Sequence, residues 1–213
     1  MKLTVNTSLT LDGVMQGPGG REEDTSGGFE RGCWLVPLAD EGMGRIVSGW
    51  FAEADAFLLG RTTFQLFQPY WEQITDPEND VAQALNNLPK YVASTTLVNP
   101  TWTKSTVLST DVLDAVAKLK AQPGRELQVH GSCKLAHALH DAGLVDEYRL
   151  FYFPVVVGQG RRLFEADTAP SGFTLVGCEQ TGAGAVCLTL RPKAFSTGDF
   201  EVQDGMEAVR EQP

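Results

Sequence analysis

The chain has 213 residues, of which 42% are hydrophobic and 21% charged, and its formal net charge is −10 at pH 7. This size and composition are typical of one globular domain. The acidic balance argues against nucleic acid as a partner, because binding a phosphate backbone normally requires a basic face. No apolar run reaches the length of a membrane span, and residues 1–9 lack the features of a secretory signal, so we expect a cytoplasmic protein without a membrane partner.

The cysteines and histidines give no sign of a metal site. Cys33, Cys133, Cys178 and Cys187 form no C-x-x-C pair and have no histidine at zinc-finger spacing. A chain of this length builds its own core, so it does not need a disulfide framework. We expect free thiols buried as small apolar side chains, and no bound metal.

The first quarter of the chain predicts a strand, a long loop and a helix. Residues 3–9 alternate and are β-prone, whereas residues 12–32 are crowded with Gly, Asp, Glu and Ser. A loop of that length usually carries function or stays mobile. Residues 37–51 have apolar side chains at helical spacing, with Asp40 and Glu41 suited to a first helical turn.

The rest of the chain repeats a strand-turn-helix unit and ends in two strands. The apolar segment at 148–157 is expected to be a central strand. The last two strands are joined by a Gly-rich turn, which predicts an antiparallel hairpin on a mostly parallel, mixed α/β sheet. Predicted strands lie at 55–59, 90–94, 106–108, 127–130, 148–157, 173–178 and 185–190, and predicted helices at 61–71, 76–88, 111–120 and 134–142.

The domain organisation is expected to be simple. Residues 1–192 carry all the periodic segments and form one domain. Residues 193–213 are polar and acidic with little periodicity. We expect this tail to be a mobile extension or an arm that touches a partner.

Two strand-to-helix turns are the strongest candidates for ligand binding. Gly60-Arg61-Thr62 and Gly131-Ser132 each follow a predicted strand and open a predicted helix. Free backbone N–H groups at a helix start favour a phosphate, and Arg61 adds a planar cation. Two such turns suit the several phosphates of a dinucleotide. The alternative is that the glycines only make tight turns and Arg61 is a solvated surface charge.

The standard nucleotide motifs are absent. There is no G-x-G-x-x-G after the first strand and no G-x-x-x-x-G-K-[ST] anywhere. Gly158-Gln159-Gly160 follows a strand but is more simply a short turn. The sequence therefore does not predict a standard dinucleotide fold or a P-loop.

Several segments, in this order, resemble the dihydrofolate-reductase-like superfamily, and specifically stand-alone relatives of the reductase half of the riboflavin-biosynthesis deaminase-reductase. The resemblance covers about Lys2 to Pro192 and implies a three-layer fold with helices on both faces of the sheet. It is carried by Ser8-Leu9-Thr10-Leu11-Asp12-Gly13, Leu58-Leu59-Gly60-Arg61-Thr62-Thr63-Phe64, Lys90-Tyr91-Val92-Ala93-Ser94, His130-Gly131-Ser132, Leu144-Val145-Asp146-Glu147-Tyr148, Pro154-Val155-Val156-Val157-Gly158-Gln159-Gly160 and Leu163-Phe164.

The resemblance implies NADPH as the cofactor. One group of residues would hold the 2′-phosphate side of adenosine, a second the pyrophosphate, and a third would lie beside the nicotinamide. Asp12 and Gly13 fall where the family has a mobile loop over that ring. The three groups are Gly60, Arg61, Thr62 and Ser94; Gly131, Ser132, Cys133, Lys134 and Leu135; and Asn6 and Thr7.

Catalytic and substrate-binding roles are expected at fewer positions. We assign Asp12 and Asp40 as catalytic, with Asp40 the positional counterpart of the carboxylate that orients the pterin in dihydrofolate reductases. Trp34, Asp40 and Pro154 are expected to contact substrate. The alternatives are a first-turn acid favoured by the helix dipole at Asp40, a turn made by Asp12 with Gly13, and a core aromatic at Trp34. The deaminase signature H-x-E with a later P-C-x-x-C is absent, so no zinc deaminase accompanies this domain.

The expected activity is hydride transfer from NADPH to a small flat heterocycle, such as a pteridine, pyrimidine or flavin precursor, or to a carbonyl. The alternatives are a ligand-binding module of the same fold without turnover, and a structural dimer with a degenerate pocket. We also expect a homodimer. Tyr148, Leu150, Tyr152 and Phe153 would pack across its two-fold axis, unless the chain's own helices cover them.

Overall fold

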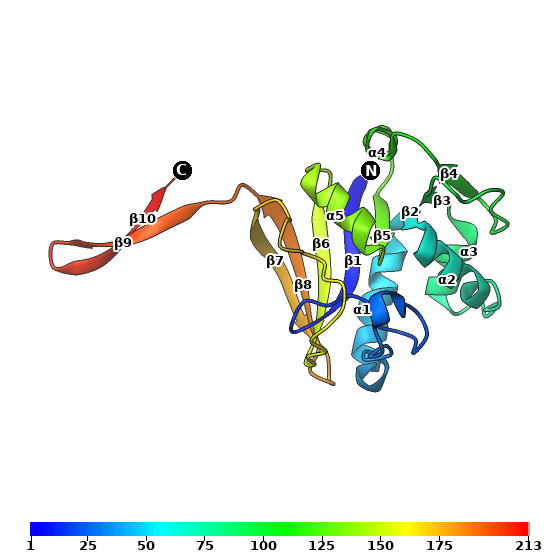
Figure 1. Ribbon diagram of the computed structural model, residues 1–213, viewed down its shortest axis with the longest axis horizontal. Coiled ribbons are helices and arrows are strands. Elements are labelled where there is room, and N and C mark those ends of the chain that lie inside the picture. The colour runs from blue at the N-terminus through cyan, green and yellow to red at the C-terminus, as the bar shows by residue number, and fades with distance from the viewer. Residues whose placement is uncertain (213) are drawn as a thin grey trace.

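A computed structural model of the chain describes residues 1–212, and its centre is an eight-stranded sheet of order β4-β3-β2-β5-β1-β6-β8-β7 (Figure 1). Strands β1 to β6 pair in parallel, whereas β8 pairs antiparallel with both β6 and β7. The predicted mixed α/β fold with a C-terminal antiparallel hairpin is thereby confirmed. The strands are β1 (Lys2–Thr10), β2 (Ala54–Gly60), β3 (Lys90–Ala93), β4 (Ser105–Leu108), β5 (Glu126–His130), β6 (Glu147–Phe153), β7 (Gly172–Gln180) and β8 (Val186–Lys193).

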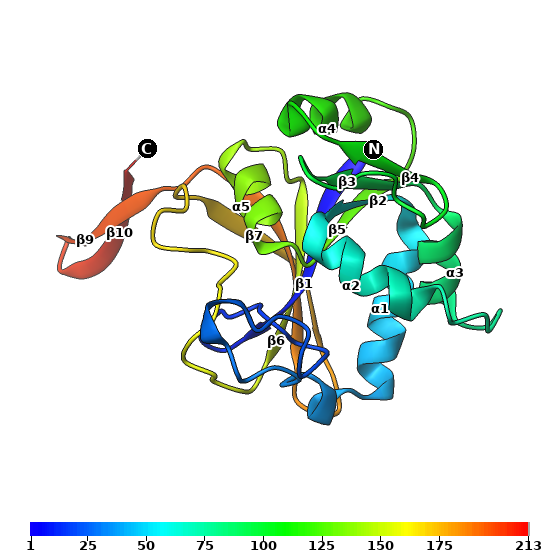
Figure 2. The same cartoon turned by 45° about the vertical axis from the view of Figure 1, so that its right-hand side comes forward.

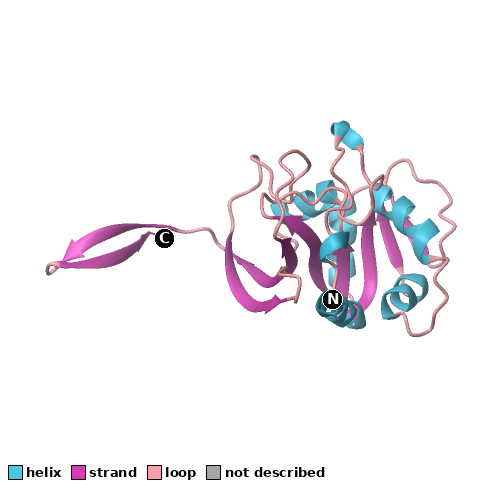
Figure 3. Cartoon of the chain, turned by 90° about the horizontal axis from the view of Figure 1, so that it is seen from below, coloured by secondary structure: helices cyan, strands magenta, loops and turns pink. Residues whose placement is uncertain are grey.

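Helices cover both faces of this sheet (Figure 3). The side chains of α4 and α5 pack on Leu3, Val5 and the apolar face of β5, whereas α1 and α3 pack on the opposite face. Among the described residues, no helix combines the length and apolarity that crossing a membrane requires. The helices are α1 (Glu41–Glu53), α2 (Arg61–Trp71), α3 (Asp80–Asn87), α4 (Val112–Lys120) and α5 (Cys133–Asp141), with short 3-10 turns at Ser26–Gly28 and Val36–Leu38.

The sheet face beneath α1 carries a buried row of charges. Arg149 on β6 donates to Glu126 at 2.7 Å and to Glu147 at 3.2 Å, and Lys2 lies 3.0 Å from each carboxylate. Burial raises the pKa of Glu126, but the hydrogen bonds and charges of Arg149 and Lys2 outweigh it and leave that pKa below its usual value. The row is tolerated because its charges are paired.

The predicted strand at 148–157 was wrong in its second half. β6 ends at Phe153, and Pro154, which has no N–H to donate to a neighbouring strand, begins an irregular segment. This segment lies beside the long loop after β1, where Val14 pairs with Arg162 (Figure 2). Val14 is fully buried, so that part of the loop is packed into the body.

The tail also differs from the prediction. Residues 197–212 form a two-stranded antiparallel hairpin of β9 (Thr197–Gln203) and β10 (Met206–Gln212), separate from the main sheet; Pro213 lies outside the described residues. Asp204 and Gly205 both have positive φ, at 53° and 76°. A two-residue turn of this kind favours an Asp-Gly pair, because its twist matches that of the strands. The hairpin itself was not predicted, and the expectation of a mobile extension or an arm that touches a partner stays a prediction.

Three of the four residues expected at a dimer contact on β6 are covered by the chain itself. Tyr148, Leu150 and Phe153 are at most 1% exposed. The ring of Phe173 lies 5.6 Å from that of Tyr148, and Phe164 packs on the same side. Tyr152, the fourth, is half-buried, and the homodimer stays a prediction.

Candidate functional site

The two turns singled out in the sequence lie side by side. β2 and β5 are neighbours in the sheet, so the helices that follow them, α2 and α5, start at the same edge. The hydroxyl of Ser132 accepts a hydrogen bond from the backbone nitrogen of Gly60 at 2.8 Å. It also lies 2.7 Å from the hydroxyl of Thr63. Ser132 thus joins the start of α5 to the start of α2.

This contact leaves both helix starts without a side-chain cap. Ser132 occupies the capping position of α5 but has a left-handed backbone with φ of 64°, and its hydroxyl points to the other turn. Gly60 occupies the capping position of α2 and has no side chain. The first-turn N–H groups of both helices therefore keep their donor capacity, next to the positive ends of two helix dipoles. Such an arrangement suits a ligand with more than one phosphate.

The glycines of the two turns are required by space and conformation. A Cβ atom on Gly60 would lie 3.0 Å from the Ser132 hydroxyl oxygen, closer than side chains normally approach. Gly131 has φ of 62°, a conformation that strains most other residues. Both turns therefore present bare backbone to the same edge.

Arg61 lies exposed at the first position of α2, and its guanidinium donates to the hydroxyl of Thr96. Thr96 is placed by Ser94, whose hydroxyl accepts from the backbone nitrogens of Thr96 and Leu97 at 3.2 and 2.9 Å. Thr62 beside Arg61 is exposed as well. The structure thus brings Arg61, Thr62 and the Ser94 loop together, and their role in binding a 2′-phosphate stays a prediction.

The residues after Ser132 contribute backbone more than side chains. The Cys133 thiol donates to the carbonyl of Arg162 at 3.0 Å, and burial raises its pKa to about 11. The Leu135 side chain packs into the core between α5 and the sheet, whereas Lys134 is exposed. Lys134 is therefore the one side chain of this group that is open to an anion.

Asn6 and Thr7 lie one strand away from the turns. Asn6 pairs in register with His130, the residue before Gly131, and is 2% exposed. Its Nδ2 donates to Thr4 at 3.3 Å, but its Oδ1 has no partner. A buried polar atom without a partner is costly, so this amide is suited to a ligand. Burial lowers the pKa of His130 to about 3, which keeps the ring neutral.

Asp12 organises the loop around it and is linked to the start of α5 through Arg162, which donates to the Asp12 carbonyl at 2.8 Å and whose own carbonyl accepts from the Cys133 thiol. Its carboxylate accepts from the Thr10 hydroxyl at 2.6 Å and from the backbone nitrogens of Gly158 and Val157 at 2.8 and 3.3 Å. Burial raises its pKa, but these hydrogen bonds outweigh burial and leave the pKa below its ordinary value. Asp12 is therefore ionised at neutral pH and has a structural task; its catalytic role stays a prediction.

Asp40 caps α1. One carboxylate oxygen accepts from the backbone nitrogen of Met43 at 2.8 Å and the other from Ala183, in the turn between β7 and β8, at 2.7 Å. These hydrogen bonds, that of Met43 first, hold the pKa of Asp40 below its ordinary value. The geometry favours the helix-start interpretation, because both oxygens are occupied by backbone donors.

The other two predicted substrate contacts do not converge with the turns. Trp34 is buried, its ring nitrogen donates to the carbonyl of Gln16 at 2.9 Å, and its ring meets that of Phe153 edge-on. Pro154 is exposed at the end of β6. Their substrate-binding roles stay predictions.

Thr63, Thr96 and His130 were not predicted as site residues. Thr63 is the second threonine of the Gly-Arg-Thr-Thr segment, and its place in that segment was the signal that could have identified it. His130 precedes the Gly131-Ser132 turn, and that position was its signal. Thr96 has no local signal, because its contact with Arg61 joins residues 35 positions apart. Among the described residues, no group of three or more His, Cys, Asp and Glu side chains is arranged to hold a metal.

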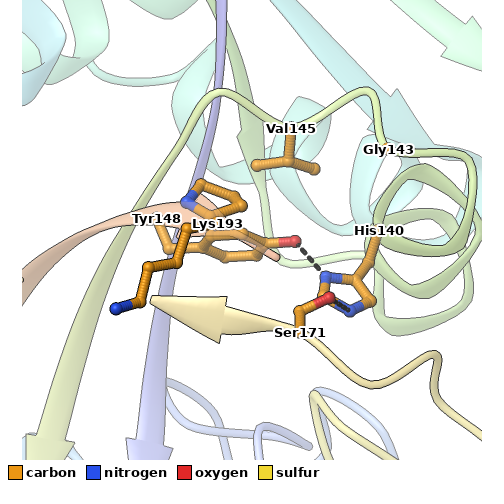
Figure 4. A pocket seen from close by; sticks show the side chains of 7 residues that line it. His140, Gly143, Val145, Tyr148, Ser171 and Lys193 are labelled. Carbon is orange, nitrogen blue, oxygen red and sulfur yellow. Dashed lines mark hydrogen bonds between the residues drawn. The ribbon is translucent and has the colours of Figure 1, made fainter. Parts of the chain in front are cut away.

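A separate cavity of about 230 Å³ lies on the α5 side of the sheet (Figure 4). His140 faces the Tyr148 hydroxyl at 2.7 Å through Nδ1, and the Ser171 hydroxyl at 3.2 Å and the Ala169 carbonyl at 3.0 Å through Nε2. A carbonyl only accepts, so Nε2 carries the proton and cannot remove one from Ser171. The arrangement is a cross-link between α5, β6 and β7, not a nucleophile with its base. The lining residues are His140, Gly143, Val145, Tyr148, Ser171, Pro192 and Lys193.

Comparison with known proteins gives similar sequences and similar folds. The chain is 29% identical over 165 residues to the uncharacterised protein YyaP of Bacillus subtilis, a match covering 76% of this chain and 80% of YyaP. A putative riboflavin biosynthesis protein from Shewanella superposes with a TM-score of 0.68 at 19% identity, over 91% of this chain and 99% of that one. A pyrimidine reductase-like protein from Corynebacterium diphtheriae superposes with a TM-score of 0.61 at 12% identity, over 91% and 92% of the two chains.

A bifunctional protein from Thermotoga maritima, described as a diaminohydroxyphosphoribosylaminopyrimidine deaminase and 5-amino-6-(5-phosphoribosylamino)uracil reductase, also superposes. Its TM-score is 0.60 at 16% identity, over 90% of this chain and 56% of that one. These likenesses confirm the predicted dihydrofolate-reductase-like fold. The sequence also matches the model of the RibD C-terminal domain over residues 1–187. The chain therefore belongs to the RibD C-terminal domain family.

Proposed function

We propose that this protein is an NADPH-dependent reductase that transfers a hydride to a small, flat heterocycle of the pyrimidine or pteridine class. The observation that carries the proposal is the Ser132–Gly60 hydrogen bond, which holds two uncapped helix starts side by side. Arg61 lies exposed at one of them. Together they form a compact set of donors for a ligand with several phosphates.

The residues present fit NADPH. The backbone N–H groups at the start of α5 would hold the pyrophosphate, and Arg61 with Thr62 and the Ser94 loop would hold the 2′-phosphate. When bound, the cofactor supplies the hydride. These local donors offset the unfavourable net charge of −10. We expect the reaction to take place in the cytoplasm.

A pyrimidine is the favoured substrate class. Two structural relatives are described as pyrimidine reductase-like and as a phosphoribosylaminouracil reductase. Asn6, with its unmatched amide oxygen, lies beside the neutral His130 on the neighbouring strand. These side chains would orient the polar edge of a heterocycle and keep it away from bulk water, without exchanging a proton at neutral pH.

The test is NADPH oxidation by the purified full chain over a panel of acceptors. The panel includes 5-amino-6-(5-phosphoribosylamino)uracil, related aminopyrimidines and dihydrofolate. Oxidation with one aminopyrimidine and formation of its reduced product would support the proposal. Tight NADPH binding without oxidation of any acceptor would favour a ligand-binding module of the same fold. Absence of heat and of thermal stabilisation with NADPH would end the cofactor assignment.

A further inference from the structure

The hairpin of β9 and β10, called the arm below, projects from the body of the molecule and is apolar on one face (Figures 1 and 3). Phe200 lies opposite Val209, and Val202 follows two residues after Phe200, so the three side chains share that face. They are 76%, 69% and 79% exposed. The face therefore consists of large apolar side chains in contact with water.

The apolar face of the arm is comparable with the largest apolar patches on typical monomers, which are often functional. Phe195 at its root and Met206 at its turn are also mostly exposed, but Met206 lies on the opposite face of the hairpin, in line with Ala208. Since an aromatic side chain offers roughly 200 Å² for burial, Phe200, Val202 and Val209 together present on the order of 300 Å². An isolated two-stranded hairpin is also only marginally stable in water. Both facts indicate that the arm is covered by a partner.

We propose that the arm binds a second copy of this chain, across the partner's edge strand β7. β7 is the last strand of the eight-stranded sheet, and its side chains Leu175 and Val176 are 57% and 45% exposed. The arm leaves the body from β8, directly beside β7. A two-fold axis at this edge would therefore bring each arm to the other copy's β7 in one reciprocal interface.

Charge favours a contact between each arm and the partner's body over a direct contact between the two arms. The arm carries five acidic residues, Asp199, Glu201, Asp204, Glu207 and Glu211, against one arginine, Arg210. Two such arms would repel each other if they paired directly. The root of the arm on the body carries exposed basic side chains, Lys193 and Arg191. Glu207 lies opposite Val202 and so shares the apolar face of the arm. That face therefore complements the apolar side chains of β7 and the basic side chains at the end of β8 in the partner.

The area is sufficient for a stable dimer. Two arms, each burying on the order of 300 Å² and covering a similar area of the partner, would remove about 1,200 Å² from water, at the lower end of standard interfaces. Tyr148, Leu150 and Phe153, which were first expected at an interface, are buried inside each chain. The arm thus provides a dimer contact that leaves the sheet core and the paired turns undisturbed.

The experiment is to measure the mass of the full chain in solution by light scattering and sedimentation over a range of concentrations. We expect a dimer for the native chain and at least a tenfold weaker dimer for Phe200→Ser/Val202→Ser. Glu201→Ser lies on the same strand but on the opposite face and is the matched control; it should stay dimeric. All variants should keep the thermal unfolding of the body, since the arm lies outside the core.

A second variant tests the surface that receives the arm. Leu175→Ser on β7 should weaken the dimer as the arm variant does. A monomeric native chain, or a dimer unchanged in Phe200→Ser/Val202→Ser, would overturn the proposal. A dimer lost in the arm variant but unchanged in Leu175→Ser would overturn the assignment of β7 as its seat.

Discussion

Ser132 and Gly60, which are 72 positions apart, are joined by one hydrogen bond of 2.8 Å between a hydroxyl oxygen and a backbone nitrogen. The bond turns a residue that would normally cap its own helix into a link between two helices. It leaves both helix starts free of side chains on the side where a polyanion would bind. The proposed NADPH site therefore depends on the closeness of the two turns.

The first prediction alters that closeness. In Gly60→Ala the new Cβ would lie 3.0 Å from the Ser132 oxygen and 3.2 Å from its Cβ, so the two turns must separate. We expect NADPH to bind about tenfold more weakly, which is a loss of about 1.4 kcal/mol of binding free energy, as measured by calorimetric titration. Gly44→Ala is the control, because that helix glycine has open space around it. It should keep the affinity and raise the free energy of unfolding by about 0.5–1 kcal/mol.

The second prediction separates the two nicotinamide cofactors. If Arg61 holds the 2′-phosphate, Arg61→Ala should weaken NADPH binding by about 1.5–3 kcal/mol, because a charge-assisted hydrogen bond is lost. NADH lacks that phosphate and should bind with nearly unchanged affinity. Arg45→Ala, at another exposed arginine that pairs with Glu179, should change neither. An equal loss for NADPH and NADH in Arg61→Ala would refute this role.

The sequence predicted the parts of the site that depend on local rules. Gly60 and Gly131 each interrupt a strand-helix pattern, and that alternation determines which edge of the sheet they reach. The sequence did not reveal that the Asp40 carboxylate accepts a hydrogen bond from Ala183, because 143 positions separate the two residues. Such contacts depend on how the β7–β8 turn packs against α1, which no local pattern encodes.

The hairpin structure of the arm was missed for a different reason. Its local signal was present, since Asp204-Gly205 lies between the alternating apolar residues Phe200 and Val202 and the segment from Met206. The acidic composition of residues 193–213 was given more weight than this turn pair. An Asp-Gly turn between alternating segments is strong evidence for a hairpin even where most of its side chains are polar.

The third prediction concerns Asp40. Asp40→Asn keeps one oxygen that can cap α1 but loses the acceptor for Ala183, so in chemical denaturation it should be less destabilised than Asp40→Ala, which loses both acceptors. Because the pKa of Asp40 is lowered in the folded chain, its stabilising effect is present above the ordinary pKa of 3.8 and is lost as pH falls below it. If Asp40→Asn abolishes NADPH oxidation while keeping stability, Asp40 has a catalytic role in addition to its cap.

The fourth prediction is a pH dependence from Lys90. This side chain is fully buried, donates to the carbonyls of Leu85 and Leu88 at 2.6 and 3.0 Å, and lies over the Trp102 ring. Burial lowers its pKa from 10.5 to about 8. Between these values the unfolded chain binds a proton that the folded chain has released, so Lys90 makes the free energy of unfolding rise with pH.

The measurement is denaturant unfolding of the native chain and of Lys90→Met from pH 7 to pH 10.5. The difference between the two free energies should change with a slope of about 1 kcal/mol per pH unit above pH 8 and should be flat below it. Lys118→Met, at an exposed lysine on α4, should show no such difference. Parallel curves for the native chain and Lys90→Met would contradict the assigned pKa.

The last prediction uses the cysteines. Burial raises the pKa of Cys133 to about 11 and that of Cys187 to about 12, whereas Cys178 is exposed on β7. At pH 8 a thiol of pKa about 11 is ionised in roughly one molecule per thousand, and the thiolate is the reactive form. Iodoacetamide should therefore label Cys178 at least a hundredfold faster than Cys133 or Cys187, as followed by peptide mass spectrometry.

Labelling in urea is the control for this last prediction, because unfolding exposes all four thiols and should equalise their rates. In the folded chain, Cys133 also donates to the carbonyl of Arg162, which holds the start of α5 against the segment after β6. Cys133→Ser keeps a donor at this position and should leave NADPH affinity unchanged, since only the backbone of this residue faces the proposed pyrophosphate. Rapid labelling of Cys133 in the native state would show that the start of α5 opens in solution, and the paired turns would then not be a preformed site.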